Sequence, residues 1–179
     1  APVDTVRRGR AITFPHDHGA HVDSRIEWWY VTGWLGAEIS QPSHGFQVTF
    51  FRRRTGLAEG IESRFAARHV LMGHAALTDV KRQTHQHAQR LARWAGDNQP
   101  SRRDRATVGG ADVAMGAWHL KRANESAAAS WYARVEASDW SLALALQPTQ
   151  AVLLQGDKGF SQKGPAADQA SHYYTEPQL

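Results

Sequence analysis

Apolar and polar residues alternate along most of the chain with a period close to two, which is the period of a β-strand and not of a helix. Residues 27–35, rich in Trp, Tyr, Val and Thr, are the clearest example, and residues 46–52 follow the same pattern. In the second segment three large apolar side chains share one face, and Gln47 lies on the other. Both segments are therefore predicted to be strands.

Six further segments carry a strand-like pattern. They are residues 70–78, 85–94, 113–120, 131–135, 140–146 and 151–154. Residues 85–94 also fit one face of a helix, and we interpret them as a strand. Turn-forming residues predict a hairpin loop over residues 36–45 and a long loop over residues 156–170, and another strand begins near Tyr173. The spacing predicts an all-β domain, either a barrel or a sandwich.

The consecutive aromatic residues of the first predicted strand cannot all face one way. Strand alternation sends Trp28 and Tyr30 to one face, and it sends Trp29 and Val31 to the other. We expect one of these pairs to fill the core and the other to line a ligand cavity.

Composition bounds the size and class of the protein. A chain of 179 residues with 41% hydrophobic residues can bury one substantial core, which favours a single domain. Seven Trp and only two Met predict a rigid aromatic interior, and the absence of Cys excludes disulfides and thiolate chemistry. No apolar run approaches the roughly 18 residues of a membrane-spanning helix.

The net charge of +4 raises the question of nucleic-acid binding, with arginine runs at residues 52–54 and 102–105. Both runs adjoin turn-forming residues, where solvated basic loops are common. Most of the Trp residues fall in predicted strands, whereas nucleic-acid binding needs aromatic and basic residues on one exposed face. We therefore expect no nucleic-acid partner.

Residues 14–21 and 27–33 crowd histidines, carboxylates and large aromatic rings into one short part of the chain. Imidazoles and carboxylates are costly to bury unless they are paired, whereas indoles favour burial. Such a mixture is typical of a pocket wall that is half apolar and half hydrogen-bonding. We expect these indoles and imidazoles to converge on one hollow inside the sheet.

Five segments together resemble the AttH-like family, which is also described as carotenoid 1,2-hydratase-like and is related to the lipocalins. They are residues 14–21, 27–33, 45–52, 74–79 and 171–174. The resemblance implies a calycin-type antiparallel β-barrel or strongly bent sandwich, with two such domains in tandem. It implies that residues 1–172 form the first domain and that residues 173–179 begin the link to a second domain that this chain lacks.

The resemblance also implies function. Members of this family include hydratases that add water to an isoprenoid double bond, and many others are exported bacterial proteins, often encoded beside ABC-transporter components. It therefore implies an apolar ligand, the second lipocalin-like domain and an ABC transporter as partners, and a periplasmic or secreted location. It implies no cofactor.

Alkene hydration needs a proton donor, a surface that tolerates a carbocation, and a positioned water. The candidate catalytic residues are Asp17, Glu27 and His74, with Asp17 or Glu27 as the acid if apolar rings raise the carboxyl pKa. Each has a structural alternative: Asp17 binds its own backbone in a turn, Glu27 pairs with Arg25 or Arg52, and His74 bonds a carbonyl. The sequence leaves these alternatives open.

The remaining candidates are predicted to bind ligand through rings, amides or charges. They are His18, His21, Trp28, Tyr30, Gln47, Arg52, Asp79 and Tyr173. Arg52 either anchors an anionic ligand or pairs with Glu27 or Asp79. A metal site built on His16 and His18, with His21 as third ligand, is conceivable from the spacing, but we expect none.

Two functions follow from the residues and the resemblance. The favoured one is binding of an apolar, isoprenoid-like or lipid-like ligand by this domain. The alternative is hydration of an isoprenoid double bond, active only together with the second domain. Hydrolysis by a serine nucleophile is not supported, because the chain has no Gly-x-Ser-x-Gly motif.

Overall fold

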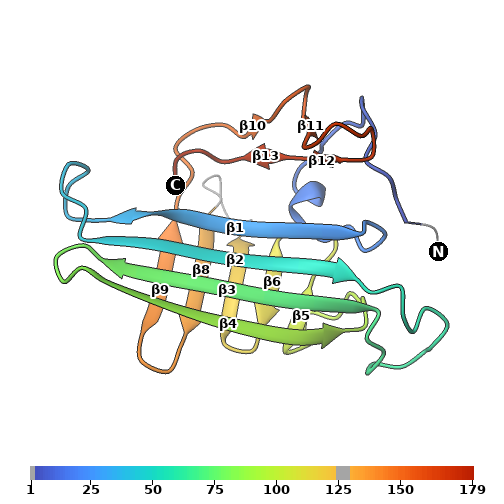
Figure 1. Cartoon of the computed structure of the whole chain (residues 1–179), viewed down its shortest axis with the longest axis horizontal. Helices are drawn as coiled ribbons and strands as arrows, with labels where there is room; N and C mark the ends of the chain where they lie inside the picture. Colours follow the sequence, from blue (N-terminus) through green and yellow to red (C-terminus); the bar gives the residue numbers. More distant parts are fainter. Residues whose placement is uncertain (1–2, 124–129) are drawn as a thin grey trace.

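The computed structural model describes residues 3–123 and 130–179 and contains two main antiparallel sheets that cross each other (Figure 1). The four-stranded sheet has the order β1 (Ile26–Leu35), β2 (His44–Arg54), β3 (His69–Asp79) and β4 (Thr84–Trp94). The five-stranded sheet comprises β5 (Asp104–Ala106), β6 (Asp112–Met115), β7 (Trp118–Ala123), β8 (Ser130–Glu136) and β9 (Ser141–Leu146). Figure 1 shows the five-stranded sheet behind the four-stranded one, with its strands running across it.

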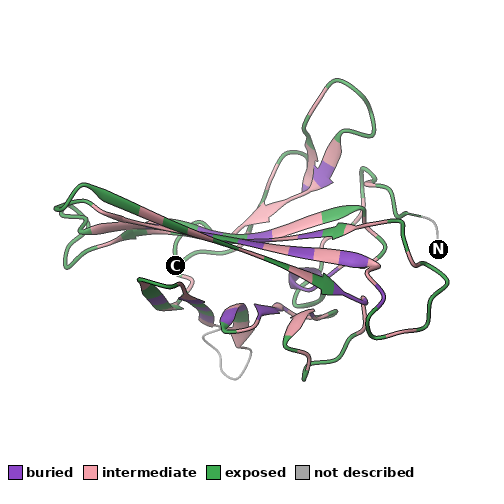
Figure 2. Cartoon of the chain, turned by 60° about the horizontal axis from the view of Figure 1, so that its bottom comes forward, coloured by how far each residue is buried: buried purple, intermediate pink, exposed green. Residues whose placement is uncertain are grey.

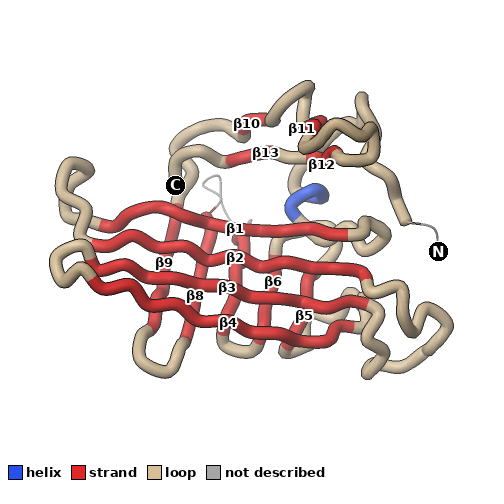
Figure 3. Tube along the Cα trace, in the orientation of Figure 1, coloured by secondary structure: helices blue, strands red, loops and turns tan. Residues whose placement is uncertain are grey.

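The C-terminal part of the chain forms two short strand pairs that lie beside the β1 edge (Figures 1 and 3). Strand β10 (Leu153–Leu154) pairs with β13 (Tyr174–Thr175), and β11 (Phe160–Gln162) pairs with β12 (Ala170–His172). The helix of the described residues is a short 3₁₀ turn, η1 (His16–His18), on the same side. No described helix has the length and apolarity that a membrane crossing requires.

The hydrophobic core lies between the two sheets, because each strand turns alternate side chains inward. In the four-stranded sheet buried and exposed positions alternate along the strands (Figure 2). Trp29 and Val31 of β1 belong to the core, so they are the pair of the first strand that fills it. A Cβ added at Gly73 would lie 3.2 Å from the Trp118 ring, which shows how closely the sheets approach. This core is filled by side chains.

Most of the predicted strands are confirmed, including residues 85–94, which form β4 and not a helix. Its sequence pattern is ambiguous because the apolar Leu91 lies on the exposed face of the strand, while the charged Arg90 lies on the other face, where it donates to the Met115 carbonyl. The single strand predicted over residues 113–120 is wrong: the chain turns at Gly116, with φ of 62°, and makes the two strands β6 and β7. The long loop predicted over residues 156–170 also contains β11.

The all-β prediction is confirmed, and the architecture is an open sandwich. The strands of the four-stranded sheet do not pair with those of the five-stranded sheet in the described residues, so the barrel is not closed. Of the two predicted forms of the lipocalin-like fold, a barrel and a strongly bent sandwich, the structure has the sandwich form.

Candidate functional site

The outer face of the four-stranded sheet, which points away from the five-stranded sheet, carries a continuous apolar row. The strand register aligns Trp28 with Phe51, Phe51 with Met72, and Met72 with Leu91, so the row crosses all four strands. Leu91 at the β4 edge is 73% exposed. The other three members are half-buried. Because apolar side chains that stay partly open on an outer sheet face can mark a binding site, we treat these four residues as a candidate binding surface and call them the apolar row.

The next two rows of the outer face are mixed or polar. The first contains Tyr30 and the exposed His74, with Thr49 between them. The second contains Gln47 and Ala76. His74 also contacts the apolar row, since its ring lies 5.9 Å from the Phe51 ring in an edge-on arrangement.

Tyr173 of the C-terminal segment covers the β1 end of this face. Its ring lies 6.2 Å from the Trp28 ring, and its hydroxyl is hydrogen-bonded to the Tyr30 hydroxyl. Burial, followed by that hydrogen bond, raises the pKa of Tyr30 to about 12. The predicted ligand-binding residues Trp28, Tyr30, Gln47 and Tyr173 and the predicted catalytic His74 are therefore on one surface.

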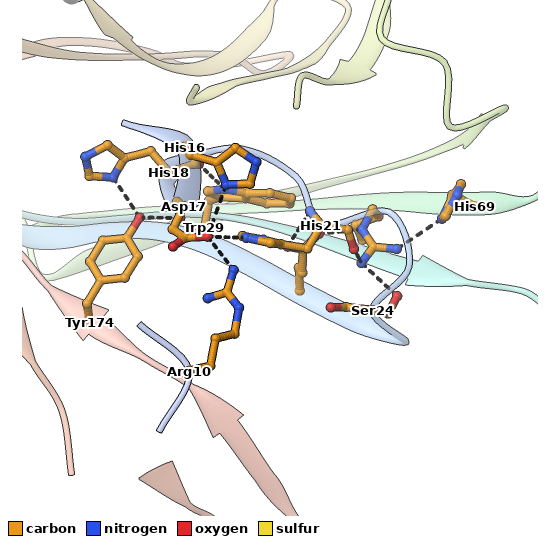
Figure 4. Close-up of polar contacts among 11 residues, drawn as sticks. Arg10, His16, Asp17, His18, His21, Ser24, Trp29, His69 and Tyr174 are labelled. Atoms are coloured by element: carbon orange, nitrogen blue, oxygen red, sulfur yellow. Dashed lines mark hydrogen bonds and ion pairs between the residues drawn. The ribbon is translucent and has the colours of Figure 1, made fainter. Parts of the chain in front are cut away.

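Four of the other predicted residues lie on the core side of the sheet, near the start of β1, in a chain of hydrogen bonds (Figure 4): Asp17, His21, Glu27 and Arg52. His21 bridges two carboxylates: its Nε2 lies 2.7 Å from Asp17 Oδ1 and its Nδ1 lies 2.6 Å from Glu27 Oε1. Arg52 Nε donates to Glu27 Oε2 at 2.7 Å, and Arg52 Nη1 donates to His69 Nδ1 at 3.1 Å. We call these five residues the buried polar network.

Arg52 is fully buried, and its remaining hydrogen bonds go to the backbone. Its Nη2 donates to the carbonyl oxygens of His21 and Ser24, at 2.8 and 2.9 Å. Of the two roles predicted for Arg52, the pairing with Glu27 is therefore observed. The same contact is the structural alternative for Glu27, an ion pair with Arg52, which the sequence left open beside the role of a catalytic acid.

The charges of the buried polar network shift the pKa values of its members. Burial alone would raise the pKa of both carboxyl groups, Asp17 and Glu27. Hydrogen bonds from Arg10 and His21 lower the pKa of Asp17. The hydrogen bond from His21 and the charge of Arg52 lower the pKa of Glu27. The premise that apolar rings raise these carboxyl pKa values is wrong. The hydrogen bond with Glu27, opposed by burial, raises the pKa of His21, because two carboxylates beside the ring favour its protonated form.

Asp17 is held at η1 by contacts that the sequence did not predict. Its Oδ1 accepts a hydrogen bond from Arg10 Nη2 at 2.7 Å (Figure 4). Its Oδ2 accepts one from the Thr13 N–H at 2.6 Å. The structural alternative for Asp17 was a carboxylate bonded to its own backbone in an Asp-x-Gly turn; the carboxylate is bonded to backbone, but to the N–H of Thr13, which precedes η1.

His18 is buried on the far side of η1 and does not share a hollow with the outer face. Its Nδ1 lies 2.8 Å from the Tyr174 hydroxyl, and its ring meets the Trp131 ring edge-on at 5.4 Å. Burial, followed by the nearby charge of Arg122, lowers the pKa of His18 to about 4. Its carbonyl accepts a hydrogen bond from Trp29 Nε1 at 3.0 Å, which ties η1 to the core.

One group of described residues has the donor set of a metal site. The donor atoms of His16, Asp17 and His21 lie within 4.8 Å of one another. This set differs from the one weighed in the sequence, because His18 points away. Arg10 also donates to Asp17 Oδ1 at 2.7 Å, so a cation held by Asp17 would lie close to a guanidinium group.

Asp79 lies at the end of β3, apart from both groups. Its carboxylate accepts the Arg82 N–H at 2.9 Å and lies 3.8 Å from His44 Nε2. These contacts lower the pKa of Asp79, and the backbone hydrogen bond contributes most.

The expected convergence of indoles and imidazoles on one hollow is therefore wrong. Strand alternation places Trp28 on the outer face and Trp29 in the core, with His18 and His21 on the core side. Two surface hollows of the described residues, of about 390 and 580 Å³, are not lined by any predicted site residue. Sequence reasoning missed Phe51, Met72 and Leu91, although their alternation in predicted strands marks them as outward neighbours.

Comparison with known proteins agrees with this fold. The family model described as AttH-like matches residues 5–179. A crystal structure of a candidate AttH from Nitrosomonas europaea superposes with a TM-score of 0.76 at 41% sequence identity, covering 97% of this chain and 48% of that one. The chain thus spans about half the length of that protein. No curated protein matches it.

Proposed function

Because the chain belongs to the AttH-like family, we propose that it is a binding domain for an apolar, isoprenoid-like or lipid-like ligand, and that this ligand lies on the outer face of the four-stranded sheet. The observation that carries the proposal is the apolar row, which continues across four strands without a charged residue. An elongated hydrocarbon matches a row of this kind better than a compact polar ligand does.

The polar groups beside the apolar row suit a ligand with few polar atoms. Tyr30, His74 and Gln47 offer hydrogen-bonding groups along one side of the row, and Tyr173 extends the aromatic surface past β1. Such sparse polar groups on an apolar surface fix the orientation of a ligand and contribute to its specificity.

Hydration of an isoprenoid double bond is the alternative, and His74 is the residue that favours it. It is exposed beside the aromatic rings of the outer face, where it could position a water. The acid is the difficulty, because Asp17 and Glu27 are engaged in the buried polar network with lowered pKa values. We therefore place the hydratase second, with the acid contributed by the rest of a two-domain protein.

The partners and the location follow the same reasoning. We propose that a second lipocalin-like domain and an ABC transporter are partners and that the protein is periplasmic or secreted. The support is the family membership and the coverage of 48% of the related protein. Fractionation of the native organism tests the location directly.

Binding is tested by titrating the full chain with geranylgeraniol and following heat and tryptophan fluorescence. The variant Leu91→Ser shortens the apolar row, and we expect its affinity to fall about tenfold. Leu57→Ser is a matched control, because Leu57 is 69% exposed, as Leu91 is 73% exposed, but lies in the loop after β2. Equal affinity of the two variants, or no binding by the unmodified chain, would contradict the proposal.

A further inference from the structure

The hollow of about 580 Å³ at the β4 edge is lined by four arginines and one carboxylate, which lie between β4, β5 and the loop after β2. The arginines are Arg64, Arg90, Arg93 and Arg103, and the carboxylate is Asp104. Its volume falls in the range of small-molecule sites, and its charge is strongly positive.

These four arginines have no ion-pair partner in the part of the chain that the structure describes, unlike other arginines nearby. In the same run of sequence Arg102 is bound to Asp97 at 2.7 Å and Arg105 to Asp112 at 2.8 Å. Arg103 lies between them without such a partner. Asp104 is the one carboxylate among these four guanidinium groups, so the hollow has an excess of positive charge that favours an anion from outside the chain.

Two of the guanidinium groups converge on the turn at Gly116. An ideal Cβ placed on Gly116 would lie 2.8 Å from Arg90 Nη1 and 3.2 Å from Arg103 Nε and Nη2. Arg90 is held in place, since it donates to the carbonyls of Met115 and Glu136 and lies 5.1 Å from the Trp118 ring centroid. A held guanidinium loses little side-chain freedom when an anion binds.

The hollow also has apolar walls, and these join it to the outer face. Phe65 is 64% exposed and Leu91 is 73% exposed, and both line the hollow. Leu91 is at the same time the last member of the apolar row. The positive hollow and the apolar row are therefore one continuous surface.

We propose that this hollow binds the phosphate or carboxylate head group of an amphiphile whose apolar part lies on the apolar row. The location of the apolar part rests on the function proposed above, whereas the anion site does not. Arginine binds both head groups through paired N–H donors, so the shared chemistry is a planar or tetrahedral oxyanion.

The test compares decyl phosphate, decanol and inorganic phosphate as ligands of the full chain, at concentrations below micelle formation. The double variant Arg93→Gln with Arg103→Gln removes two charges from the hollow, and both residues are exposed. Arg25→Gln is the matched control, because Arg25 is an exposed arginine outside the hollow. Calorimetry gives the affinities, and the melting temperature of each variant confirms that it is folded.

We expect the unmodified chain to bind decyl phosphate about tenfold or more tightly than decanol, and the double variant to lose this preference while it keeps its affinity for decanol. Phosphate that competes with decyl phosphate supports the head-group site, even if decanol fails to bind and the apolar row is thereby contradicted. Equal affinities for decyl phosphate and decanol, a preference that persists in the double variant, or no binding of either phosphate overturns the inference. In the first two cases decanol binding still supports the proposed function.

Discussion

Arg52 is the residue on which the buried polar network depends. Its side chain is fully buried, and a buried charge is tolerated only when its partners replace the lost water. Glu27 supplies the opposite charge, and the carbonyls of His21 and Ser24 accept two further hydrogen bonds. The network therefore fixes the start of β1 against the end of β2.

Replacing Glu27 by Gln is expected to destabilise the protein by about 3 kcal/mol or more, because Arg52 would remain buried without a counter-charge. Urea unfolding followed by circular dichroism measures the change. Glu59→Gln is the control, since Glu59 pairs with Arg54 at the surface, and its unfolding midpoint should stay at the wild-type value. A Glu27 variant as stable as the control would show that the ion pair is dispensable.

His69 makes stability depend on pH. Burial, followed by the charge of Arg52, lowers its pKa from 6.5 to about 4, and His18 is shifted in the same direction. Between pH 6.5 and pH 4 the His69 side chain binds a proton in the unfolded chain but not in the folded chain. The free energy of unfolding therefore falls as the pH decreases from 6.5 to 4. His21 has the opposite sign: its contribution is complete below pH 6.5 and is lost as pH rises.

The expected result is that His69→Gln shows a shallower loss of melting temperature than the unmodified chain between pH 6.5 and 4. His87→Gln is the control, because His87 is exposed on β4. Parallel curves for the unmodified chain and the His69 variant would rule out this contribution.

At the residue scale, the sequence indicated which residues form an ion pair better than it indicated which arginine has no ion-pair partner. The Glu27 pairing with Arg52 was one of two open alternatives, and paired β1 and β2 make it possible. Nothing in the run of residues 102–105 distinguishes Arg103 from its neighbours, because their partners Asp97 and Asp112 come from other turns of the chain. Partner identity depends on tertiary contacts that spacing does not contain.

At the scale of elements, period-two alternation predicted long strands reliably and short strands poorly. Residues 27–35 and 46–52 fall within β1 and β2. The β6 to β7 hairpin was predicted as one strand, since Val113 and Leu120 are both apolar and the turn at Gly116 is short. Apolar runs with a single glycine do not reveal whether the chain continues or reverses.

The 3₁₀ turn η1 is positioned by close backbone packing at Gly19. A Cβ at this position would lie 2.6 Å from Gly109 N and 2.9 Å from Thr107 O, and backbone atoms cannot move aside as a side chain can. Gly19→Ala should therefore destabilise the protein by about 1–3 kcal/mol. Urea unfolding tests this against Gly60→Ala, where nothing lies within 4 Å of the added Cβ. Equal stability of the two variants would refute the packing argument.

At the scale of the whole molecule, the four-stranded sheet separates a structural face from the face on which we propose that the ligand binds. The core face carries Trp29 and the buried polar network, and the outer face carries the apolar row. The sequence predicted the alternation but not which face was which, because that depends on where the five-stranded sheet packs. It also could not align Trp28 with Leu91, since register across four strands is set by turns and pairing.

The adjacent indoles of β1 test this division most directly. Trp29 is 8% exposed and donates to the His18 carbonyl at 3.0 Å, so Trp29→Leu should cost about 2 kcal/mol or more by leaving a cavity and an unpaired carbonyl. Trp28→Leu should leave the urea midpoint nearly unchanged but weaken geranylgeraniol binding several-fold, because Trp28 is the β1 member of the apolar row. Each variant is the control for the other, since the same substitution is made one residue apart on opposite faces. If Trp28→Leu lost stability and kept its affinity, the outer face would be a structural surface and not the place where the ligand binds.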